Sequence, residues 1–180
     1  DVFLDGLISE ENTDRLADTM QAFSLLMKVN QVEKYRACAT SAMRESTNGQ
    51  QVADEVYKRT GVRIDIIDGA EEASIIASTD ISSLIQKDKD YLYIDVGGGS
   101  TEFTVFSKGK VKKSRSFPIG TVRLLDNKVS NKTWEEVEHW IKKHTKDCEH
   151  IEAIGSGGNI NKIHKNSNSR EGEPLSYQYL

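Results

Sequence analysis

Residues 95–102, Asp-Val-Gly-Gly-Gly-Ser-Thr-Glu, place three glycines between two carboxylates. Consecutive glycines let backbone N–H groups approach a ligand closely, or allow positive φ angles. Neighbouring N–H groups in such a turn form a concavity that attracts anions such as phosphate. The carboxylates of Asp95 and Glu102 would repel a phosphate unless a cation lay between them, so the stretch implies Mg²⁺ or another divalent cation. The alternative is a plain hairpin with a flexible glycine turn.

Two other groups of residues could act on a phosphate. Thr40, Ser41 and Arg44 follow a short predicted strand, at the end where ligands bind in α/β sheets. Arg suits bidentate phosphate contact, although spacing alone favours a surface Arg at a helix start. Glu71 and Glu72 open a predicted helix, where acidic residues complement the helix dipole. The functional interpretation is that one of these carboxylates projects into a cleft as a general base.

A second glycine-rich turn, at residues 155–159, follows another predicted strand. Neither turn has the common nucleotide-binding patterns. The phosphate-loop pattern G-x-x-x-x-G-K-[ST] is absent from the sequence. The dinucleotide pattern G-x-G-x-x-G fails at its last position, which is Glu102 in the first turn and Ile160 in the second.

Alternating strands and helices must position these residues, and the pattern indicates an α/β architecture. Apolar periodicity and turn residues define the elements. Two helices have candidate capping boxes, Thr47 with Gln50 and Thr133 with Glu136. The sequence predicts helices at 9–30, 47–61, 68–86 and 133–146, strands at 35–40, 62–67, 91–94, 103–106 and 151–154, and a hairpin turn at 107–110.

Length and composition limit the function classes. The chain has 180 residues, enough for one domain or two small ones, and no apolar run approaches the ~20 residues that cross a bilayer. A net charge of −4 argues against binding to a nucleic-acid duplex but allows an anionic substrate at a local site. Two separated cysteines and the absence of a signal-peptide pattern favour a reducing, cytoplasmic location without membrane attachment.

Five stretches, in order, resemble the exopolyphosphatase/guanosine pentaphosphate phosphohydrolase (Ppx/GppA phosphatase) family of the actin-like ATPase superfamily. Each motif alone is weak, but together they cover nearly the whole chain. The resemblance implies a two-domain α/β fold of the actin, hexokinase and chaperone-ATPase (ribonuclease H-like) type. We expect residues 1–78 and 79–180 to form the two domains, with the boundary near Ile76–Asp80. The matching stretches are 39–44, 69–73, 95–102, 116–124 and 154–158.

The resemblance also implies roles, residue by residue. Glu72 would activate water, with Glu71 as second choice, and Arg44 would contact a substrate phosphate. Asp95 and Glu102 would hold the divalent metal. The terminal phosphates would be bound by the backbone N–H groups of Gly97, Gly98, Gly99 and Ser100. We expect further phosphate contacts at Thr40, Ser41, Gly155, Gly157 and Gly158.

The function expected from this resemblance is Mg²⁺-dependent release of terminal phosphate from inorganic polyphosphate or guanosine pentaphosphate, between which the sequence does not choose. Alternatives are an ATPase or kinase of the same superfamily and a non-catalytic phosphate- or nucleotide-binding module. The family often forms homodimers. Its first phosphate motif, Asp-x-Gly-Ser-Asn-Ser, is not found here. We therefore expect the N-terminal strands to be missing and the second domain to be truncated at its C-terminal end, which would leave this segment alone poorly active.

Overall fold

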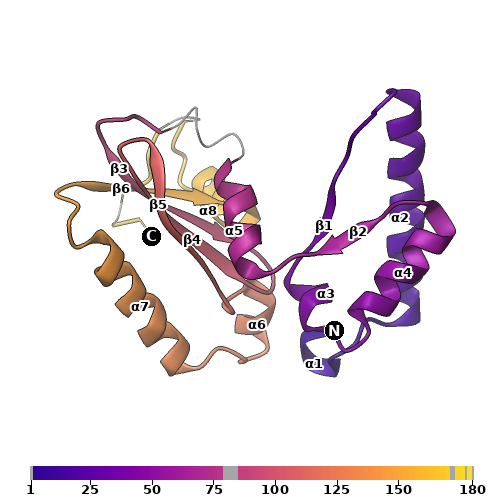
Figure 1. Cartoon of the computed structure of the whole chain (residues 1–180). Coiled ribbons are helices and arrows are strands. Elements are labelled where there is room, and N and C mark those ends of the chain that lie inside the picture. The colour runs from indigo at the N-terminus through magenta and orange to yellow at the C-terminus, as the bar shows by residue number, and fades with distance from the viewer. Residues whose placement is uncertain (1, 79–84, 171–172, 177, 180) are drawn as a thin grey trace. The chain divides into compact units, whose positions relative to one another are not determined.

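The computed structural model describes residues 2–78, 85–170, 173–176 and 178–179 (Figure 1). The chain forms two compact units, residues 1–72 and 73–180. The division falls within helix α5 (Gly69–Ser78). The domain boundary expected after residue 78 stays a prediction, and Asp80 lies outside the described residues. The prediction of one helix over 68–86 is wrong at its end, because Gln86 is not helical.

Unit 1 packs helices on a pair of short parallel strands. Strands β1 (Ala37–Ala39) and β2 (Ile64–Ile66) pair with Ala37 opposite Ile64. The helices are α1 (Val2–Asp5), α2 (Glu10–Val29), α3 (Ser41–Glu45) and α4 (Gly49–Thr60). None of the helices in the described ranges is long and apolar enough to cross a membrane. The core of unit 1 contains Ala17 of α2, Met43 of α3 and the face of α4 made by Val52, Ala53 and Val56.

The ends of the unit 1 helices test the capping predictions. The side chain of Ser9 accepts a hydrogen bond from the Asn12 N–H and begins α2 as predicted. Gly61, with φ of +71°, ends α4 as predicted. The capping box at Thr47 is wrong, because its hydroxyl donates to the Gly6 carbonyl and α4 begins later, at Gly49. This bond joins residues 41 positions apart, so no local pattern in the sequence predicts it.

Unit 2 is built on a four-stranded sheet with the order β5-β4-β3-β6 (Figure 1). Its central pair is antiparallel, as are β4 and β5, whereas β3 and β6 are parallel. Helix α7 begins before the predicted capping box, because Ser130 caps it through the Thr133 N–H and Glu136 instead pairs with Arg115. The elements are β3 (Asp90–Val96), β4 (Thr101–Ser107), β5 (Lys110–Phe117), α6 (Thr121–Leu125), α7 (Asn131–Thr145), β6 (Ile151–Ser156) and α8 (Gly158–Asn166).

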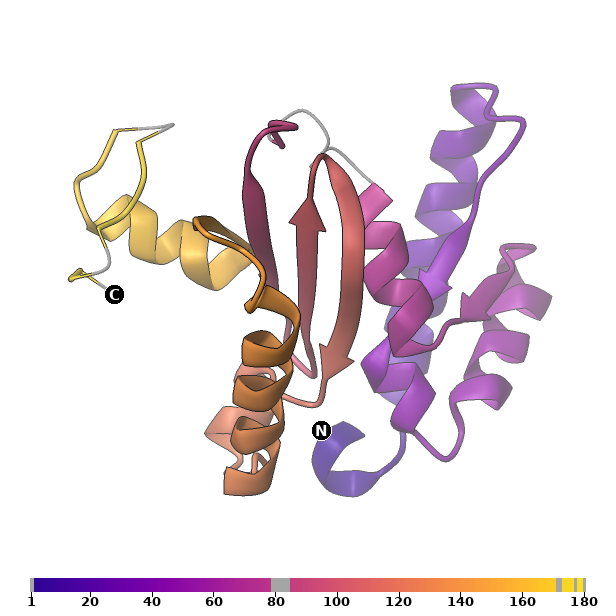
Figure 2. The same cartoon turned by 60° about the vertical axis from the view of Figure 1, so that its left-hand side comes forward.

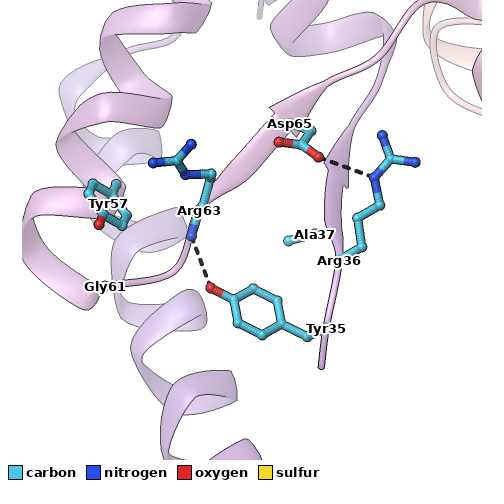
Figure 3. A pocket seen from close by; sticks show the side chains of 7 residues that line it. All are labelled: Tyr35, Arg36, Ala37, Tyr57, Gly61, Arg63 and Asp65. Atoms are coloured by element: carbon cyan, nitrogen blue, oxygen red, sulfur yellow. Dashed lines mark hydrogen bonds and ion pairs between the residues drawn. The ribbon is translucent and has the colours of Figure 1, made fainter. Parts of the chain in front are cut away.

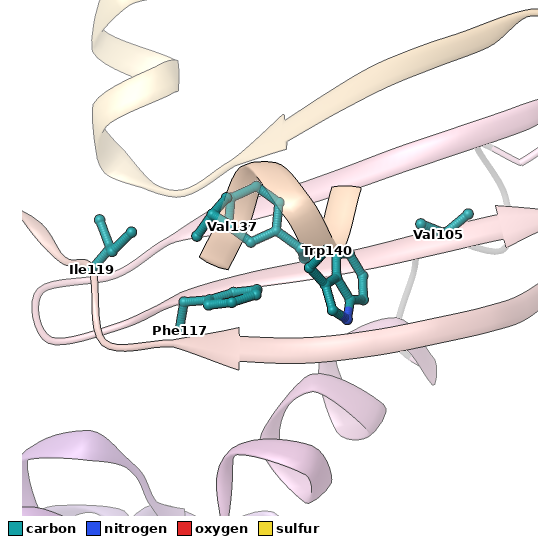
Figure 4. Packing of buried hydrophobic residues seen from close by; sticks show 6 residues of the cluster. Val105, Phe117, Ile119, Val137 and Trp140 are labelled. Atoms are coloured by element: carbon teal, nitrogen blue, oxygen red, sulfur yellow. The ribbon is translucent and has the colours of Figure 1, made fainter. Parts of the chain in front are cut away.

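Both faces of this sheet are covered, and that fixes its register. Figure 4 shows one face, where Phe117 packs against Trp140 of α7 with ring centroids 6.0 Å apart. On the other face, Tyr91, Tyr93 and Phe106 form a second buried cluster. A one-residue slip would exchange the two faces of a strand, so the packing holds each strand in place. The residues at the ends of β3 and β4 are therefore positioned by the core.

Candidate functional site

The predicted base and the predicted arginine meet in unit 1. Arg44, on α3, donates from Nη1 to Glu72 Oε2 at 3.0 Å and to the carbonyl oxygen of Ile67 at 2.8 Å. Glu72 lies in the first turn of α5 and only 7% of its surface is exposed. Both residues follow the carboxyl ends of β1 and β2, where α/β sheets bind ligands. The ion pair fixes the position of this buried carboxylate.

Glu71 has a different environment from its neighbour. Its carboxylate accepts from Arg36 Nη2 at 2.7 Å, and its side chain is 44% exposed. The hydrogen bond to Glu71 is the largest cause of the raised pKa of Arg36, followed by the bond to Asp65. Asp68 caps α5 by accepting from the N–H groups of Ala70 and Glu71. Because neighbouring helical residues point about 100° apart, this cap directs Glu72 inward and Glu71 toward solvent.

Thr40 and Ser41 lie where β1 leads into α3. The Thr40 carbonyl accepts from the Arg44 N–H at 2.9 Å, which is the first bond of that helix. Ser41 is 6% exposed. Both residues therefore lie at the strand end that carries Arg44. Their phosphate contacts stay predictions.

Unit 1 also contains a hollow of about 350 Å³, shown in Figure 3. Arg36 crosses its side and donates to Asp65 Oδ2 at 3.1 Å. The hollow lies at the amino ends of β1 and β2, away from the ends that carry Arg44 and Glu72. The residues predicted to contact phosphate lie at the carboxyl ends instead. The hollow is lined by Tyr35, Arg36, Ala37, Tyr57, Gly61, Arg63 and Asp65.

The glycine turn of unit 2 faces α6 with its carbonyl groups. The carbonyl oxygens of Gly97, Gly98 and Gly99 accept, in order, from the Thr121 N–H at 3.0 Å, the Val122 N–H at 2.9 Å and the Arg123 Nε–H. Among the described residues, none accepts a hydrogen bond from the N–H groups of Gly98 and Gly99. Backbone amides arranged in this way can bind an anion.

Close approach requires a glycine at position 120, whereas positive φ does not explain the glycines of the turn. Positive φ angles occur at other glycines but not at Gly97, Gly98 or Gly99. A Cβ atom on Gly120 would lie 2.2 Å from the carbonyl oxygen of Gly98. Gly120 and the first turn of α6 therefore hold the glycine turn, a role that sequence reasoning missed. The available signal was the stretch at 116–124, one of the five matching stretches, which has no role predicted for Gly120.

The two predicted metal ligands are direct neighbours across β3 and β4. Asp95 and Glu102 are partners in the strand register, so their side chains share one face of the sheet. Glu102 is 3% exposed and accepts from Ser116 Oγ at 2.7 Å. Burial raises the pKa of Asp95, against the opposing effect of a hydrogen bond from Tyr93. Ser156 of β6 lies opposite Asp95 and continues the same polar row.

This donor set fits a divalent cation of the magnesium type. Within the described residues, no group of three or more His, Cys, Asp or Glu side chains could hold a metal. Mg²⁺ is commonly bound through one or two carboxylates, with substrate phosphates and water as the other ligands. Asp95 and Glu102 supply two carboxylates. Both are shielded from water to some degree, so a bound cation would offset their charge.

The second glycine turn lies at the same end of the sheet. Gly157 has φ of +99°, and a Cβ atom there would lie 2.8 Å from the Val96 carbonyl oxygen and 3.3 Å from Asp95 Oδ1. A Cβ atom on Gly155 would lie 2.9 Å from Cγ1 of Ile160, so Ile160 packs closely against this glycine. A Cβ atom on Gly158, the first residue of α8, would meet no neighbouring atom within 4 Å. Asp95 therefore lies between the two glycine-rich turns.

One family model covers both the residues around Glu72 in unit 1 and the glycine turn at 97–99 in unit 2. The Ppx/GppA phosphatase family model matches residues 2–154. The chain is 33% identical to a bifunctional 3-dehydroquinate synthase/phosphatase of Fusobacterium nucleatum over 86% of its length and 25% of that protein. It is 29% identical to exopolyphosphatase 1 of Mycobacterium leprae over 66% of its length and 35% of that protein. The chain thus spans a quarter to about a third of the length of these relatives.

Solved structures give the same fold. An exopolyphosphatase from Cytophaga hutchinsonii superposes with a TM-score of 0.74 at 24% identity, covering 96% of this chain and 59% of that one. A Ppx/GppA family member from Aquifex aeolicus superposes with a TM-score of 0.69 at 21% identity, over 99% of this chain and 60% of that one. The predicted α/β fold is therefore confirmed.

Proposed function

Because this chain belongs to the Ppx/GppA phosphatase family, we propose that the protein is a hydrolase that removes terminal phosphate from inorganic polyphosphate. The observation that carries the proposal is the glycine turn, whose carbonyls bond to α6 while the amides of Gly98 and Gly99 have no protein acceptor among the described residues. Exopolyphosphatases among the relatives favour polyphosphate as the substrate.

The proposed binding step uses backbone amides and a divalent cation together. The N–H groups of Gly98, Gly99 and Ser100 hold the terminal phosphate, and the turn after β6 contributes Gly157 and Gly158. Asp95 and Glu102 would hold the cation, which supplies neutralisation of the phosphate oxygens. Phosphoryl transfer depends mainly on positioning and charge neutralisation, and these are what a rigid glycine turn beside two carboxylates provides.

The proposed chemical step uses Glu72 as the general base. Its carboxylate takes a proton from water as the water oxygen bonds to the terminal phosphorus. The phosphoanhydride P–O bond breaks, and the shortened chain leaves with that bridging oxygen. Arg44 supports this proposal by holding Glu72 in one position at 3.0 Å. A positioned base of this kind contributes about 10²–10⁴-fold to a rate.

Guanosine pentaphosphate is the second candidate substrate, because it also ends in a phosphoanhydride-linked phosphate and the name of the matched family covers it. The same amides, carboxylates and base would serve both substrates. The two differ only away from the terminal phosphate, where one carries a guanosine and the other a longer phosphate chain.

The test is phosphate release by the protein produced at the full length of its gene. Long-chain polyphosphate and guanosine pentaphosphate are each assayed with Mg²⁺, with a chelator, and with the Glu72→Gln variant. We expect Mg²⁺-dependent release that collapses in the variant, and faster release from polyphosphate. Absence of release from both substrates, in a protein that still binds polyphosphate, would favour a non-catalytic binding module instead.

A further inference from the structure

A row of polar side chains crosses the sheet of unit 2 at the end that carries the glycine turns. In the order of the strands, it contains Ser116 of β5, Glu102 of β4, Asp95 of β3 and Ser156 of β6. Figure 2 shows β3 and β4 side by side within this sheet. Because register partners share one face, these four side chains point the same way. The function proposed above uses the two carboxylates and leaves their neighbours without a role.

A second row lies on the same face, two residues nearer the start of β3. Tyr93 lies opposite Thr104, which lies opposite Ser114. Tyr93 and Thr104 are both buried. The hydroxyl oxygens of Thr104 and Ser114 are 2.6 Å apart. The carboxylates of the first row therefore have buried hydroxyl groups beside them within the protein.

The Tyr93 hydroxyl connects Asp95 with Ser156. It is hydrogen-bonded to the Asp95 carboxylate and to the Ser156 side chain. An ionised carboxylate only accepts hydrogen bonds, and a tyrosine hydroxyl has one hydrogen, so Tyr93 donates to Asp95 and accepts from Ser156. The Tyr93 ring packs in a buried cluster with Tyr91 and Phe106. A rigidly held donor thus sets the direction of the Asp95 carboxylate.

The second glycine turn confines Asp95 as well. A Cβ atom on Gly157 would lie 3.3 Å from Asp95 Oδ1, so the backbone of this turn passes close to that oxygen. The neighbouring carboxylate has a comparable donor, because Glu102 accepts from Ser116 Oγ at 2.7 Å. A carboxylate has about four lone-pair sites, so Asp95 can accept from Tyr93 and still bind a cation.

We propose that Tyr93 is a positioning residue that orients Asp95 for binding of the divalent cation. This proposal rests on the proposed function, in which Asp95 and Glu102 hold that cation. Hydrogen bonds to a ligating carboxylate fix its orientation, and their loss typically lowers metal affinity by about 10–100-fold. Tyr93 acts through Asp95, so its removal should change the affinity for the cation and spare the chemical step.

The experiment compares two tyrosine-to-phenylalanine variants of the full-length protein. Tyr93→Phe removes the hydroxyl that donates to Asp95. Tyr91→Phe is the matched control, because Tyr91 is buried in the same cluster but its hydroxyl accepts from the Gln86 N–H at 3.4 Å. Tyr91 lies four residues before Asp95, about 13 Å along the strand. Titration with Mn²⁺, with free Mn²⁺ measured by electron paramagnetic resonance, gives the cation affinity without substrate.

We expect Tyr93→Phe to weaken Mn²⁺ binding about tenfold, whereas Tyr91→Phe should bind Mn²⁺ like wild type. Asp95→Asn should abolish the binding, which identifies the measured site. In phosphate release, Tyr93→Phe should raise the Mg²⁺ concentration for half-maximal rate about tenfold. Its kcat at saturating Mg²⁺ should stay within about twofold of wild type. Thermal unfolding without divalent cations checks that each variant keeps its fold, since added cation would not correct a purely structural defect.

Unchanged or tighter Mn²⁺ binding in Tyr93→Phe would overturn the proposal, and so would an equal loss in Tyr91→Phe. Wild type that binds no Mn²⁺, or binding that survives Asp95→Asn, would overturn it as well. If wild type binds Mn²⁺ through Tyr93 and Asp95 but releases no phosphate, the proposed hydrolase function fails and the role of Tyr93 stands. If release is normal and Mg²⁺-dependent but Mn²⁺ binding ignores Tyr93, the Tyr93 proposal alone fails.

Discussion

The two units position charge in different ways. In unit 1, a side chain holds the charged group in place, because Arg44 of α3 donates hydrogen bonds to Glu72 of α5 and to the Ile67 carbonyl oxygen. In unit 2, the backbone holds the polar groups in place. The turn at 97–99 forms hydrogen bonds to α6, and the strand register puts Asp95 opposite Glu102. The first arrangement suits one precisely held proton acceptor, and the second suits a larger anion with its cation. Side-chain truncations should therefore damage unit 1 most, and backbone crowding should damage unit 2 most.

The largest expected effect separates the adjacent glutamates of unit 1. Glu72→Gln should lower kcat for polyphosphate hydrolysis by about 10²–10⁴-fold, because the general base is lost. Glu71→Gln should leave kcat within a few-fold, because that carboxylate is half exposed and held by Arg36. Steady-state phosphate release measures both. Equal losses in the two variants would remove the distinction between the buried and the exposed carboxylate.

Next in size is the loss of the ion pair that positions Glu72. Arg44→Ala should lower the free energy of unfolding by about 1.5–3 kcal/mol, because a buried charged acceptor loses its partner. The measurement is urea denaturation followed by circular dichroism. Arg36→Ala is the matched control, and its effect should be smaller because its ion pairs are exposed. A larger effect at Arg36 would contradict this account of unit 1.

Backbone crowding tests unit 2. Gly120→Ala should destabilise the protein by about 1–3 kcal/mol and raise KM for polyphosphate, because the new methyl group overlaps the Gly98 carbonyl oxygen. Gly158→Ala is the control for stability alone, since a Cβ there meets nothing within 4 Å. Chemical denaturation and steady-state kinetics are the readouts. If both variants behave like wild type, the contact with Gly120 does not hold the glycine turn.

The smallest effect concerns the carboxylates of unit 2. Burial raises the pKa of Asp95, so the folded protein holds that proton to higher pH than the unfolded chain does. Stability therefore falls as pH rises through this window. Without divalent cations, Asp95→Asn should raise Tm slightly at pH 7, and the difference should vanish below the ordinary pKa of Asp. Mg²⁺ should then raise the Tm of wild type more than that of the variant. A lower Tm in the metal-free variant at pH 7 would contradict the proposal that Asp95 is a buried carboxylate that binds a cation.

Local patterns in the sequence predicted most elements but not every boundary. Ser9 and Gly61 were predicted correctly because an N-cap hydroxyl and a left-handed C-terminal residue act within one turn of their helix. The boxes at Thr47 and Thr133 failed because Thr47 found a carbonyl far along the chain and Ser130 competed for the same N–H group. The partner of Thr47 lies 41 positions away and leaves no local signal. Ser130, in contrast, lies three positions before Thr133 and is a competing local N-cap.

The sequence by itself determined the alternating α/β order, the two glycine-rich turns, and the residue types for binding phosphate and a cation. These follow from short-range spacing and from the limits on φ, ψ and side-chain chemistry. Only the tertiary structure decided that Glu72 pairs with Arg44 while Glu71 pairs with Arg36, and that Gly120 supports the glycine turn. It also gathered the cations of β5 and α7 around His144. The Arg44–Glu72, Arg36–Glu71 and Gly120–Gly98 contacts join residues 22 or more positions apart, so packing, not propensity, selects the partner.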